Sequence, residues 1–497
     1  MLCGLGLLVF WANIDGGHAL AMLRKQQKID KERSEWLRQE DTELARLHPA
    51  QRRKLKKKTK WTQVQPPDPN QQMPKWTSIV TKPSKSSSFF ADNTSFEKLG
   101  ASPEILQALA SIQVTQPSQI QAVSFQPILE GSDAIIADQT GSGKTLAYLA
   151  PMVQTLRECE KGEGRTPPGQ VRAIVIVPTS ELAQQVARVA RCISVGGAPF
   201  RSAIATGEHK WATQKKQLQG GLELLVATPG RLAAHVDAAS FSLSSLRRIV
   251  LDEVDVLYED ADFDNIWFDL RDALPPRTAQ CFVTATLPPA VETAILRDCP
   301  LAKKLSSPGL HRTREGVRQK LIDCSSGSSA GTPEDGFRLK IRALEAELEL
   351  EPASQVLIFC NTIESCRRVE NALCRRDRNG ERWELGVFHG ALTAEARKQA
   401  FQKLIGDAPR ASPSLPLLVI CTDRASRGMD FPRVQHVVLF DFPRDGVEYV
   451  RRVGRVTRGG NAPGRVTSLC LGRQMPYAKK LMQLNEKGEI IDMETNA

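Results

Sequence analysis

Short apolar runs alternate with longer amphipathic segments from about Ser95 to the end of the chain. In the first half these runs are Ala134–Ala137, Ala173–Val177, Leu224–Ala227, Ile249–Leu251 and Cys281–Thr284. The pattern restarts after Val317, with runs at Leu321–Asp323, Val356–Phe359, Leu385–Phe388, Leu417–Cys421, Val437–Phe440 and Val466–Leu469. Apolar runs separated by helical stretches predict parallel strands with helices on both faces of each sheet. We therefore expect two α/β domains of similar size in tandem.

The first fifth of the chain has a different pattern. Residues from about Ala19 to Lys60 predict a charged helix that ends in the basic run Arg52–Lys58. The segment Pro66–Ser88 is rich in Pro, Gln, Lys and Ser, which is typical of a linker. We expect a basic, partly helical extension in residues 1–93, a first domain in residues 94–310 and a second domain in residues 311–497.

Composition supports folded domains and indicates a polyanionic partner. Hydrophobic residues make up 41% of the chain and charged residues 25%, as in soluble globular proteins. The net charge is +11, and +8 of it lies in residues 1–93, where 17 Lys and Arg residues face 9 Asp and Glu residues. This extension is either a solvated tail or an arm that holds RNA without choosing its sequence, and the two readings are compatible.

The cysteines and the first residues bear on the compartment. The 11 cysteines include no C-x-x-C pair and no cluster with His at metal-ligand spacing, which favours reduced thiols and no zinc module. The apolar stretch Leu2–Ala12, about eleven residues, is too short to span a bilayer. It is either the core of a targeting peptide, although no positive segment precedes it, or a truncated start. We expect no membrane association.

A glycine-rich segment between a predicted strand and a predicted helix indicates phosphate binding. It comprises Thr140, Gly141, Ser142, Gly143, Lys144 and Thr145. Such glycines let backbone N–H groups surround a polyphosphate, while the lysine reaches the outer phosphates and the threonine hydroxyl binds Mg²⁺. The strict pattern has a small residue five positions before Gly143, where this chain has Asp138.

Two carboxylates follow the predicted buried strand Ile249–Leu251. Asp252 is placed to hold the shell of a Mg²⁺ ion, and Glu253 to orient or deprotonate an attacking water. Together with the phosphate loop they predict a nucleoside triphosphatase. Upstream, Gln121 suits both hydrogen-bonding edges of adenine and Phe96 suits its ring, so we expect ATP with Mg²⁺.

These motifs together resemble the DEAD-box family of ATP-dependent RNA helicases, from about Ser95 to the C-terminus. The resemblance implies two tandem RecA-like domains, a coupling role for Asp255, Thr284 and Thr286, and RNA as partner through backbone contacts with little sequence choice. The segments that resemble the family's RNA-facing motifs are Pro178–Ala183, Ala227–Leu232, Leu357–Thr362, Phe388–Gly390 and Cys421–Asp430. The residues that it implies for RNA binding are Thr179, Thr228, Gly230, Arg231, His389 and Thr422.

The segment Tyr449–Gly460 resembles the family's arginine motif. Arg455 and Arg458 are three residues apart, so on a helix they share a face and can both neutralise charge on the γ-phosphoryl group. A basic surface helix is the alternative. The resemblance also implies that Asp430 contacts the ribose from the same side, so that ATP joins the two domains and RNA strengthens their closure.

Several positions depart from the family pattern without removing an ATPase residue. Arg451 occupies the position at which the family's arginine motif usually begins with histidine. The hydrogen bonds that this histidine makes toward the acidic motif must therefore be replaced or lost. Ser180, directly after Thr179, occupies the position at which the family usually has an arginine that binds the RNA backbone. The other departures are Val254, Thr284 and Thr206–Gly207.

In combination, these variants resemble a plant and algal plastid subgroup of the family. The segments that carry this resemblance are Asp252–Asp255, Thr284–Thr286, Asp441–Arg444, Tyr449–Arg452 and Asn485–Gly488. It implies ribosomal RNA maturation in a chloroplast, with ribosome-assembly proteins as possible partners; otherwise we expect cytoplasm or nucleus.

We expect a monomeric enzyme that hydrolyses ATP and locally unwinds RNA. The alternative is an ATP-binding RNA clamp or ribosome-assembly scaffold with negligible turnover, and a DNA helicase is disfavoured.

Overall fold

The computed structural model describes residues 78–80, 89–260, 262–311, 317–325, 332–406, 410, 412, 414–423, 431, 433–456 and 464–487. All of them belong to one compact unit, Lys75–Ala497. The predicted charged helix, the basic run Arg52–Lys58 and the apolar start of the chain lie outside the described residues. None of the helices in the described part of the chain is long and apolar enough to cross a membrane.

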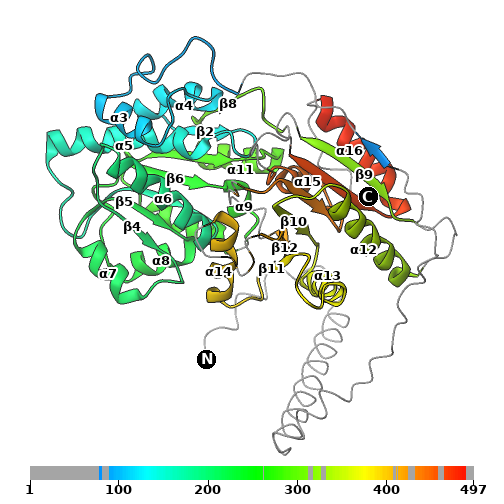
Figure 1. The fold of residues 1–497 in the computed structure, drawn as a ribbon. Helices are drawn as coiled ribbons and strands as arrows, with labels where there is room; N and C mark the ends of the chain where they lie inside the picture. The colour runs from blue at the N-terminus through cyan, green and yellow to red at the C-terminus, as the bar shows by residue number, and fades with distance from the viewer. Residues whose placement is uncertain are drawn as a thin grey trace, which may run out of the picture. The chain divides into compact units, whose positions relative to one another are not determined.

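The first sheet contains seven strands, and all their pairings are parallel (Figure 1). Its strand order is β4-β5-β3-β6-β7-β2-β8. The strands are β2 (Ala134–Ala137), β3 (Val171–Ile176), β4 (Ser202–Ala205), β5 (Leu222–Ala227), β6 (Arg248–Asp252), β7 (Ala279–Thr284) and β8 (Lys303–Ser306).

Helices cover both faces of this sheet because alternate residues of its buried strands point to opposite sides. Val175 of β3 packs in one core with the first four helices, whereas Ile174 packs in the other core with later helices. The helices are α3 (Pro103–Ser111), α4 (Gln119–Leu129), α5 (Lys144–Glu163), α6 (Ser180–Val195), α7 (Trp211–Gln219), α8 (Pro229–Asp237), α9 (Val254–Leu257), α10 (Phe263–Asp272) and α11 (Pro289–Asp298).

The second sheet also contains seven strands, in the order β1-β9-β14-β13-β10-β12-β11. Its pairings are parallel except for β1, which pairs antiparallel with β9. The strands are β1 (Ser78–Val80), β9 (Arg318–Asp323), β10 (Gln355–Phe359), β11 (Glu384–Phe388), β12 (Leu417–Cys421), β13 (His436–Leu439) and β14 (Arg465–Cys470).

The second sheet is likewise buried on both faces. Leu357 and Ile358 of β10 belong to different cores, one on each side. The helices are α12 (Pro333–Leu350), α13 (Ile363–Arg376), α14 (Ala394–Ile405), α15 (Gly446–Val453), the 3-10 helix η2 (Gly472–Gln474) and α16 (Met475–Lys487). The predicted fold class, two tandem α/β domains with helix-flanked parallel sheets, is confirmed.

Three strands were not predicted. β4 and β8 lie at the two edges of the first sheet, and β8 is largely exposed, so neither carries a long apolar run. β1 falls inside the predicted linker Pro66–Ser88 and adds to the second sheet. Edge strands need fewer apolar residues because one side or face meets solvent.

The parallel topology brings the sequence motifs of the first domain to one end of the sheet. The phosphate loop follows β2, the acidic motif follows β6 and Thr284–Thr286 ends β7, and these three strands are neighbours. We call these segments (Asp138–Thr145, Asp252–Asp255, Thr284–Thr286) the candidate nucleotide edge. The ends of β4, β5 and β3 lie on the other side of β6, and we call the segments that follow them (Thr206–Lys210, Thr228–Arg231, Thr179) the candidate RNA edge.

Candidate functional site

The phosphate loop has the backbone conformation that its glycines make possible. Gly141 has φ 69° and Gly143 has φ 93°, in the left-handed region that costs other residues more. A Cβ on Gly143 would lie 2.4 Å from Nε2 of Gln121, so this position also lacks room for a side chain. The Ser142 hydroxyl is buried and has no hydrogen-bond partner among the described residues. A buried donor at this place suits a phosphate oxygen.

Lys144 lies at the first turn of α5 and is held by the loop that it would serve. Its Nζ donates hydrogen bonds to the carbonyl oxygens of Asp138 (2.8 Å) and Gln139 (2.9 Å). Burial lowers the pKa of this ammonium group, and the carboxylates of Glu253, Asp138 and Asp252 oppose that shift. A buried cation surrounded by acids is poised to exchange these carbonyl contacts for phosphate oxygens.

Asp138, the departure from the loop pattern, has a local structural role. Its Oδ1 accepts hydrogen bonds from the backbone N–H of Gln139 (2.9 Å) and the hydroxyl of Ser307 (2.7 Å). The side chain is buried and ties the start of the loop to the segment after β8. The carboxylate is therefore partnered inside the protein.

Asp252 and Glu253 form a buried acidic pair at the end of β6. Asp252 accepts hydrogen bonds from the hydroxyl of Tyr148 (2.9 Å) and from the N–H of Glu253 (2.9 Å). Burial, followed by the charges of Asp255 and Asp252, raises the pKa of Glu253 to about 7. The Glu253 backbone is left-handed, with φ 53°, which is strained for a residue with a side chain and is common at functional sites.

Tyr148 is a site residue that the sequence analysis missed. Its spacing from Lys144 contained the signal, because residues four apart in a helix lie on the same face. The phenol is fully buried between α5 and the acidic strand. It fixes the orientation of Asp252.

The coupling candidates are joined by hydrogen bonds. Thr286 donates from Oγ1 to Oδ2 of Asp255 at 2.6 Å, and Thr284 donates from Oγ1 to the carbonyl oxygen of Thr286 at 2.5 Å. The Thr284 carbonyl in turn accepts from the N–H of Asp138 at 3.2 Å. The acidic motif, the end of β7 and the phosphate loop therefore form one connected network.

The second domain brings groups to this network. The Thr140 hydroxyl donates to the carbonyl oxygen of Gly454 at 3.0 Å, and a Cβ on Gly454 would lie 2.0 Å from that hydroxyl. Arg455 is buried, and its charge adds to the effect of burial in lowering the pKa of Lys144. Arg451 donates to Oδ2 of Asp255 from Nη2 at 2.7 Å and from Nε at 3.3 Å. An ion pair thus stands where the family's histidine contacts are expected.

The proposed adenine contacts are engaged within the protein. Gln121 accepts from the N–H of Ser118 at 3.0 Å and donates to the carbonyl oxygen of Gly143 at 3.2 Å. A carboxamide has a second lone pair and a second N–H, so adenine pairing remains chemically open to it. Phe96 lies in the core, edge-to-face with Phe125 at 6.2 Å between ring centroids.

The residues proposed to hold Mg²⁺ provide oxygen donors. Thr145, at the second position of α5, supplies a hydroxyl, and Asp252 supplies a carboxylate. Mg²⁺ is usually bound by one or two protein oxygens together with water and phosphate oxygens, so this donor set fits the ion.

The candidate RNA edge is more open. Gly207 and Gly230 are exposed, and Thr228 and Arg231 are half-buried. Thr179 is buried, and its hydroxyl caps α6 by accepting from the N–H of Leu182 at 3.2 Å.

An aromatic group that the sequence analysis missed supports Arg231. The Arg231 guanidinium donates to the carbonyl oxygen of Gly207 at 3.3 Å and lies 5.5 Å from the ring centroid of Trp211. Trp211 stacks on the ring of His235 with centroids 3.8 Å apart and planes 6° apart. His235 binds Gln214, whose amide donates to two carbonyl oxygens of the Thr206–Lys210 segment.

The RNA candidates of the second domain follow neighbouring strands. β11 and β12 pair in parallel with Phe388 opposite Cys421, so His389 and Thr422 leave the sheet at the same level. Burial lowers the pKa of His389, which makes it a neutral hydrogen-bonding group near pH 7. Its Nδ1 is buried without a partner among the described residues. Asp430 and Arg458 lie outside the described residues.

A second contact joins the two domains near the candidate RNA edge, and the sequence did not predict it. Arg397 of α14 donates to Glu181 at 2.9 Å and to Glu208 at 3.1 Å. Glu181 lies in the first turn of α6, and Glu208 follows β4. The two domains are therefore linked by ion pairs at both edges.

Solved structures with a similar fold include two RNA-bound proteins. S. cerevisiae Dbp5 bound to RNA and ADP BeF3 aligns with a TM-score of 0.65 at 22% identity, over 79% of this chain and 93% of that chain. Mss116p bound to ssRNA and AMP-PNP aligns with a TM-score of 0.65 at 21% identity, over 82% of this chain and 80% of that chain. These likenesses show the tandem RecA-like fold.

Two of the similar sequences come from plants. DEAD-box ATP-dependent RNA helicase 50 of Arabidopsis thaliana is 42% identical over 419 residues, which cover 84% of this chain and 53% of the relative. The protein of the same name from Oryza sativa subsp. japonica is 43% identical over 401 residues, which cover 80% of this chain and 62% of the relative. This chain thus spans less than two thirds of the length of these relatives.

Two family descriptions match successive parts of the chain. Residues 118–294 match the DEAD/DEAH box helicase family, and residues 339–460 match the helicase conserved C-terminal domain. The matched ranges contain the phosphate loop and acidic motif in the first domain and Arg451 and Arg455 in the second. The chain belongs to the DEAD-box RNA helicase family.

Proposed function

We propose that this protein is an RNA-dependent ATPase that uses ATP hydrolysis to unwind short RNA duplexes or remodel ribonucleoproteins. The observation that carries the proposal is the buried cluster at the candidate nucleotide edge. There a phosphate-loop lysine, an acidic pair and an arginine from the other domain influence one another's protonation. This is the set of groups that phosphoryl transfer from ATP requires.

Each group has a role in this proposal. Lys144 binds the outer phosphates, and Thr145 and Asp252 hold Mg²⁺, which supplies positive charge to the phosphate oxygens when bound. Glu253 accepts the proton of the attacking water, a task that suits a carboxylate with a pKa of about 7. Arg455 stabilises the charge that develops on the γ-phosphoryl group.

The arrangement favours an enzyme over a non-catalytic RNA clamp. Arg451, which replaces the family's histidine, is paired with Asp255 instead of lying unpartnered in the cleft. The acidic motif therefore keeps a link to the second domain. RNA would bind across both sheets through Thr228, Gly230, Arg231 and His389, with phosphate and sugar contacts that carry little sequence information.

We further propose ribosomal RNA as the substrate class and a plastid as the compartment. This rests on the resemblance of Asp252–Asp255, Thr284–Thr286 and Tyr449–Arg452 to the plastid subgroup. Sequencing of RNA crosslinked to the protein in plastids would test both statements. Crosslinks spread over messenger RNAs, or a protein absent from plastids, would contradict them.

The activity is tested by ATP hydrolysis with and without structured RNA, together with strand separation of a short duplex. We expect RNA to stimulate hydrolysis, and ATP to be required for strand separation. Lys144→Ala is the control, because it removes the cation of the phosphate loop. Tight binding of ATP and RNA with no turnover would identify a clamp and overturn the proposed enzyme.

A further inference from the structure

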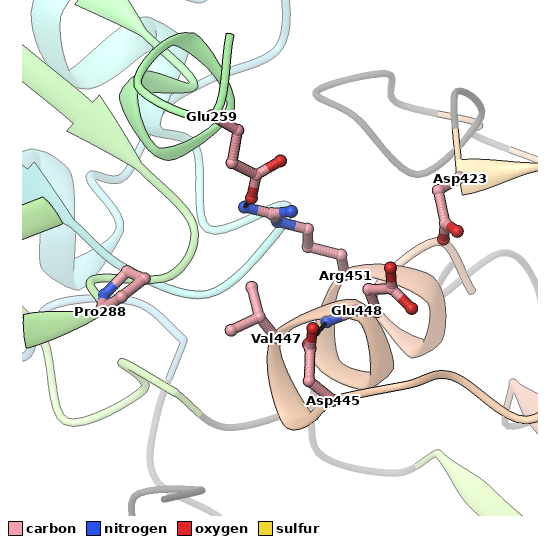
Figure 2. Close-up of a pocket in the computed structure, with 7 residues that line it drawn as sticks. All are labelled: Glu259, Pro288, Asp423, Asp445, Val447, Glu448 and Arg451. Atoms are coloured by element: carbon pink, nitrogen blue, oxygen red, sulfur yellow. Dashed lines mark hydrogen bonds and ion pairs between the residues drawn. The ribbon is translucent and has the colours of Figure 1, made fainter. Parts of the chain in front are cut away.

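Arg451 reaches across the cleft between the two domains and contacts two carboxylates of the first domain. Its side chain extends from α15, and its Nη2 donates to Asp255 at 2.7 Å and to Glu259 at 3.0 Å. The Arg451 side chain is 6% exposed and that of Asp255 is 1% exposed, whereas that of Glu259 is 47% exposed. Figure 2 shows the guanidinium extending from α15 toward the carboxylate of Glu259.

Arg451 also has acidic neighbours in its own domain. A cavity of about 210 Å³ beside it is lined by Asp423, Asp445 and Glu448 as well as Glu259. Asp423 is bound by Arg452 at 2.6 Å, and Asp445 caps α15 by accepting from the N–H of Glu448 at 2.8 Å. Of the four carboxylates that line the cavity, Glu259 belongs to the first domain. It therefore attracts Arg451 toward that domain, as Asp255 does.

The guanidinium geometry explains why a second carboxylate matters. Asp255 Oδ2 already accepts the hydroxyl of Thr286, so Arg451 shares that oxygen. An arginine has five donors in a rigid plane, whereas an imidazole has two. Arginine in place of histidine at this position adds hydrogen-bond donors and a positive charge. Glu259 accepts one of the added hydrogen bonds.

We propose that Glu259 is a positioning residue that holds Arg451 across the cleft and thereby favours the closed arrangement of the two domains. The inference rests on the proposed function, because closure on ATP and RNA is what the contact would assist. The contact also joins α15 to Thr286 through Asp255. It therefore links the approach of the second domain to the end of β7 at the candidate nucleotide edge.

Domain closure can be measured directly in the full chain. Cys192 on α6 and Cys374 on α13 are exposed and lie in different domains, so they suit a pair of fluorescent labels. Cys3 and Cys159 would be replaced by serine to direct the labelling. With a saturating non-hydrolysable ATP analogue, titration with single-stranded RNA gives the RNA concentration for half-maximal closure.

We expect Glu259→Gln to raise that RNA concentration about two- to fivefold, as for loss of one partly exposed ion pair. The double variant with Arg451→His isolates the interaction, since Glu259→Gln should then have no further effect. Asp264→Asn is the matched control: it removes an exposed carboxylate of α10 and should leave the midpoint unchanged.

The outcomes separate this inference from the proposed function. If the unmodified protein closes on RNA and Glu259→Gln closes identically, the positioning role is wrong and the helicase proposal stands. An equal effect of Glu259→Gln in both backgrounds would show that Glu259 acts without Arg451, which also overturns the inference. If the unmodified protein does not close with RNA and the analogue, the proposed function fails and the inference fails with it.

Discussion

The candidate nucleotide edge and the candidate RNA edge of the first domain differ in how their polar groups are satisfied. At the candidate nucleotide edge, Lys144, Asp252, Glu253 and Asp255 are each at most 8% exposed and perturb one another's pKa. At the candidate RNA edge, the glycines are exposed and Arg231 is half-buried. The candidate nucleotide edge is an interlocked buried network, whereas the candidate RNA edge keeps Thr179 and Thr206 buried but exposes its glycines.

This difference follows from the chemistry that each edge is proposed to perform. Groups that act on a phosphoryl group must be oriented in a site of low dielectric constant before the substrate arrives. Groups that follow an RNA backbone gain affinity from many contacts that each contribute little. Single substitutions should therefore have large effects at the candidate nucleotide edge and small effects at the candidate RNA edge.

The largest effect is expected for Lys144→Ala. Removing the ammonium group leaves the loop glycines in place but deletes the cation that would meet the outer phosphates. We expect RNA-stimulated ATP hydrolysis to fall by about a thousandfold, at the upper end for loss of one electrostatic group. Steady-state phosphate release measures it, and hydrolysis within tenfold of the unmodified rate would contradict the role.

Glu253→Gln should have the next largest effect, because it keeps the shape of the side chain but removes the proton acceptor. We expect kcat to fall about a hundredfold while ATP and RNA still bind. Single-turnover hydrolysis together with equilibrium binding separates these steps. Asp264→Asn, which removes an exposed carboxylate, serves as the charge control, and near-normal turnover by Glu253→Gln would show that another group is the base.

The pKa of Glu253 gives a pH dependence with a defined sign. Since burial raises the pKa to about 7, the carboxylate is lost below that pH, and kcat/KM for ATP should fall about tenfold for each unit. The raised pKa means that the folded state binds the proton of Glu253 more tightly than the unfolded state does. The stabilisation that this proton provides is complete below pH 4.5, the ordinary pKa of a glutamate, and is lost as the pH rises through 7. Glu253→Gln should thus raise Tm more at pH 8 than at pH 5, and a flat acid limb would count against the assignment.

Gln121→Ala tests the boundary of the candidate nucleotide edge. The amide is buried and contacts Gly143, so its loss should raise KM for ATP and reduce the preference for ATP over GTP by about tenfold. Ser118→Ala is the matched control, because it disturbs the same helix cap and leaves the amide. Equal use of ATP and GTP by the unmodified protein would refute adenine recognition.

The buried strands could be predicted from the sequence because a run of consecutive apolar residues is stable only in the interior of the protein. Ala134–Ala137 and Leu417–Cys421 have the bounds predicted for them. β14 extends past its predicted run at both ends, whereas β3 begins earlier than predicted, at Val171, and ends at Ile176, before the predicted end at Val177. β8 was missed because its polar residues carry no periodic signal. β1 was missed because a three-residue pairing inside a polar segment depends on a partner strand far along the chain.

The site residues were predictable where one segment holds the whole motif, as in the phosphate loop. Contacts between distant segments were not. The spacing of Tyr148 from Lys144 places both on one helix face but does not give its partner Asp252, and no local pattern pairs Arg397 with Glu181. The replacement of histidine by Arg451 was visible in the sequence. Its compensation by Asp255 and Glu259 was not, because it depends on how α15 is placed against α9 and the residues that follow α9.

The smallest effect is expected at the candidate RNA edge, for Trp211→Ala. The Arg231 guanidinium lies over the Trp211 ring, so loss of Trp211 should weaken RNA binding about threefold by releasing that arginine. Trp211→Phe keeps an aromatic face and should retain most of the affinity. In an Arg231→Ala background, Trp211→Ala should add little, because the two side chains act together. Fluorescence anisotropy with a short single-stranded RNA at fixed salt measures these affinities. A hundredfold loss from Trp211→Ala alone would break the comparison, because it would make this open edge as sensitive to single substitutions as the buried one.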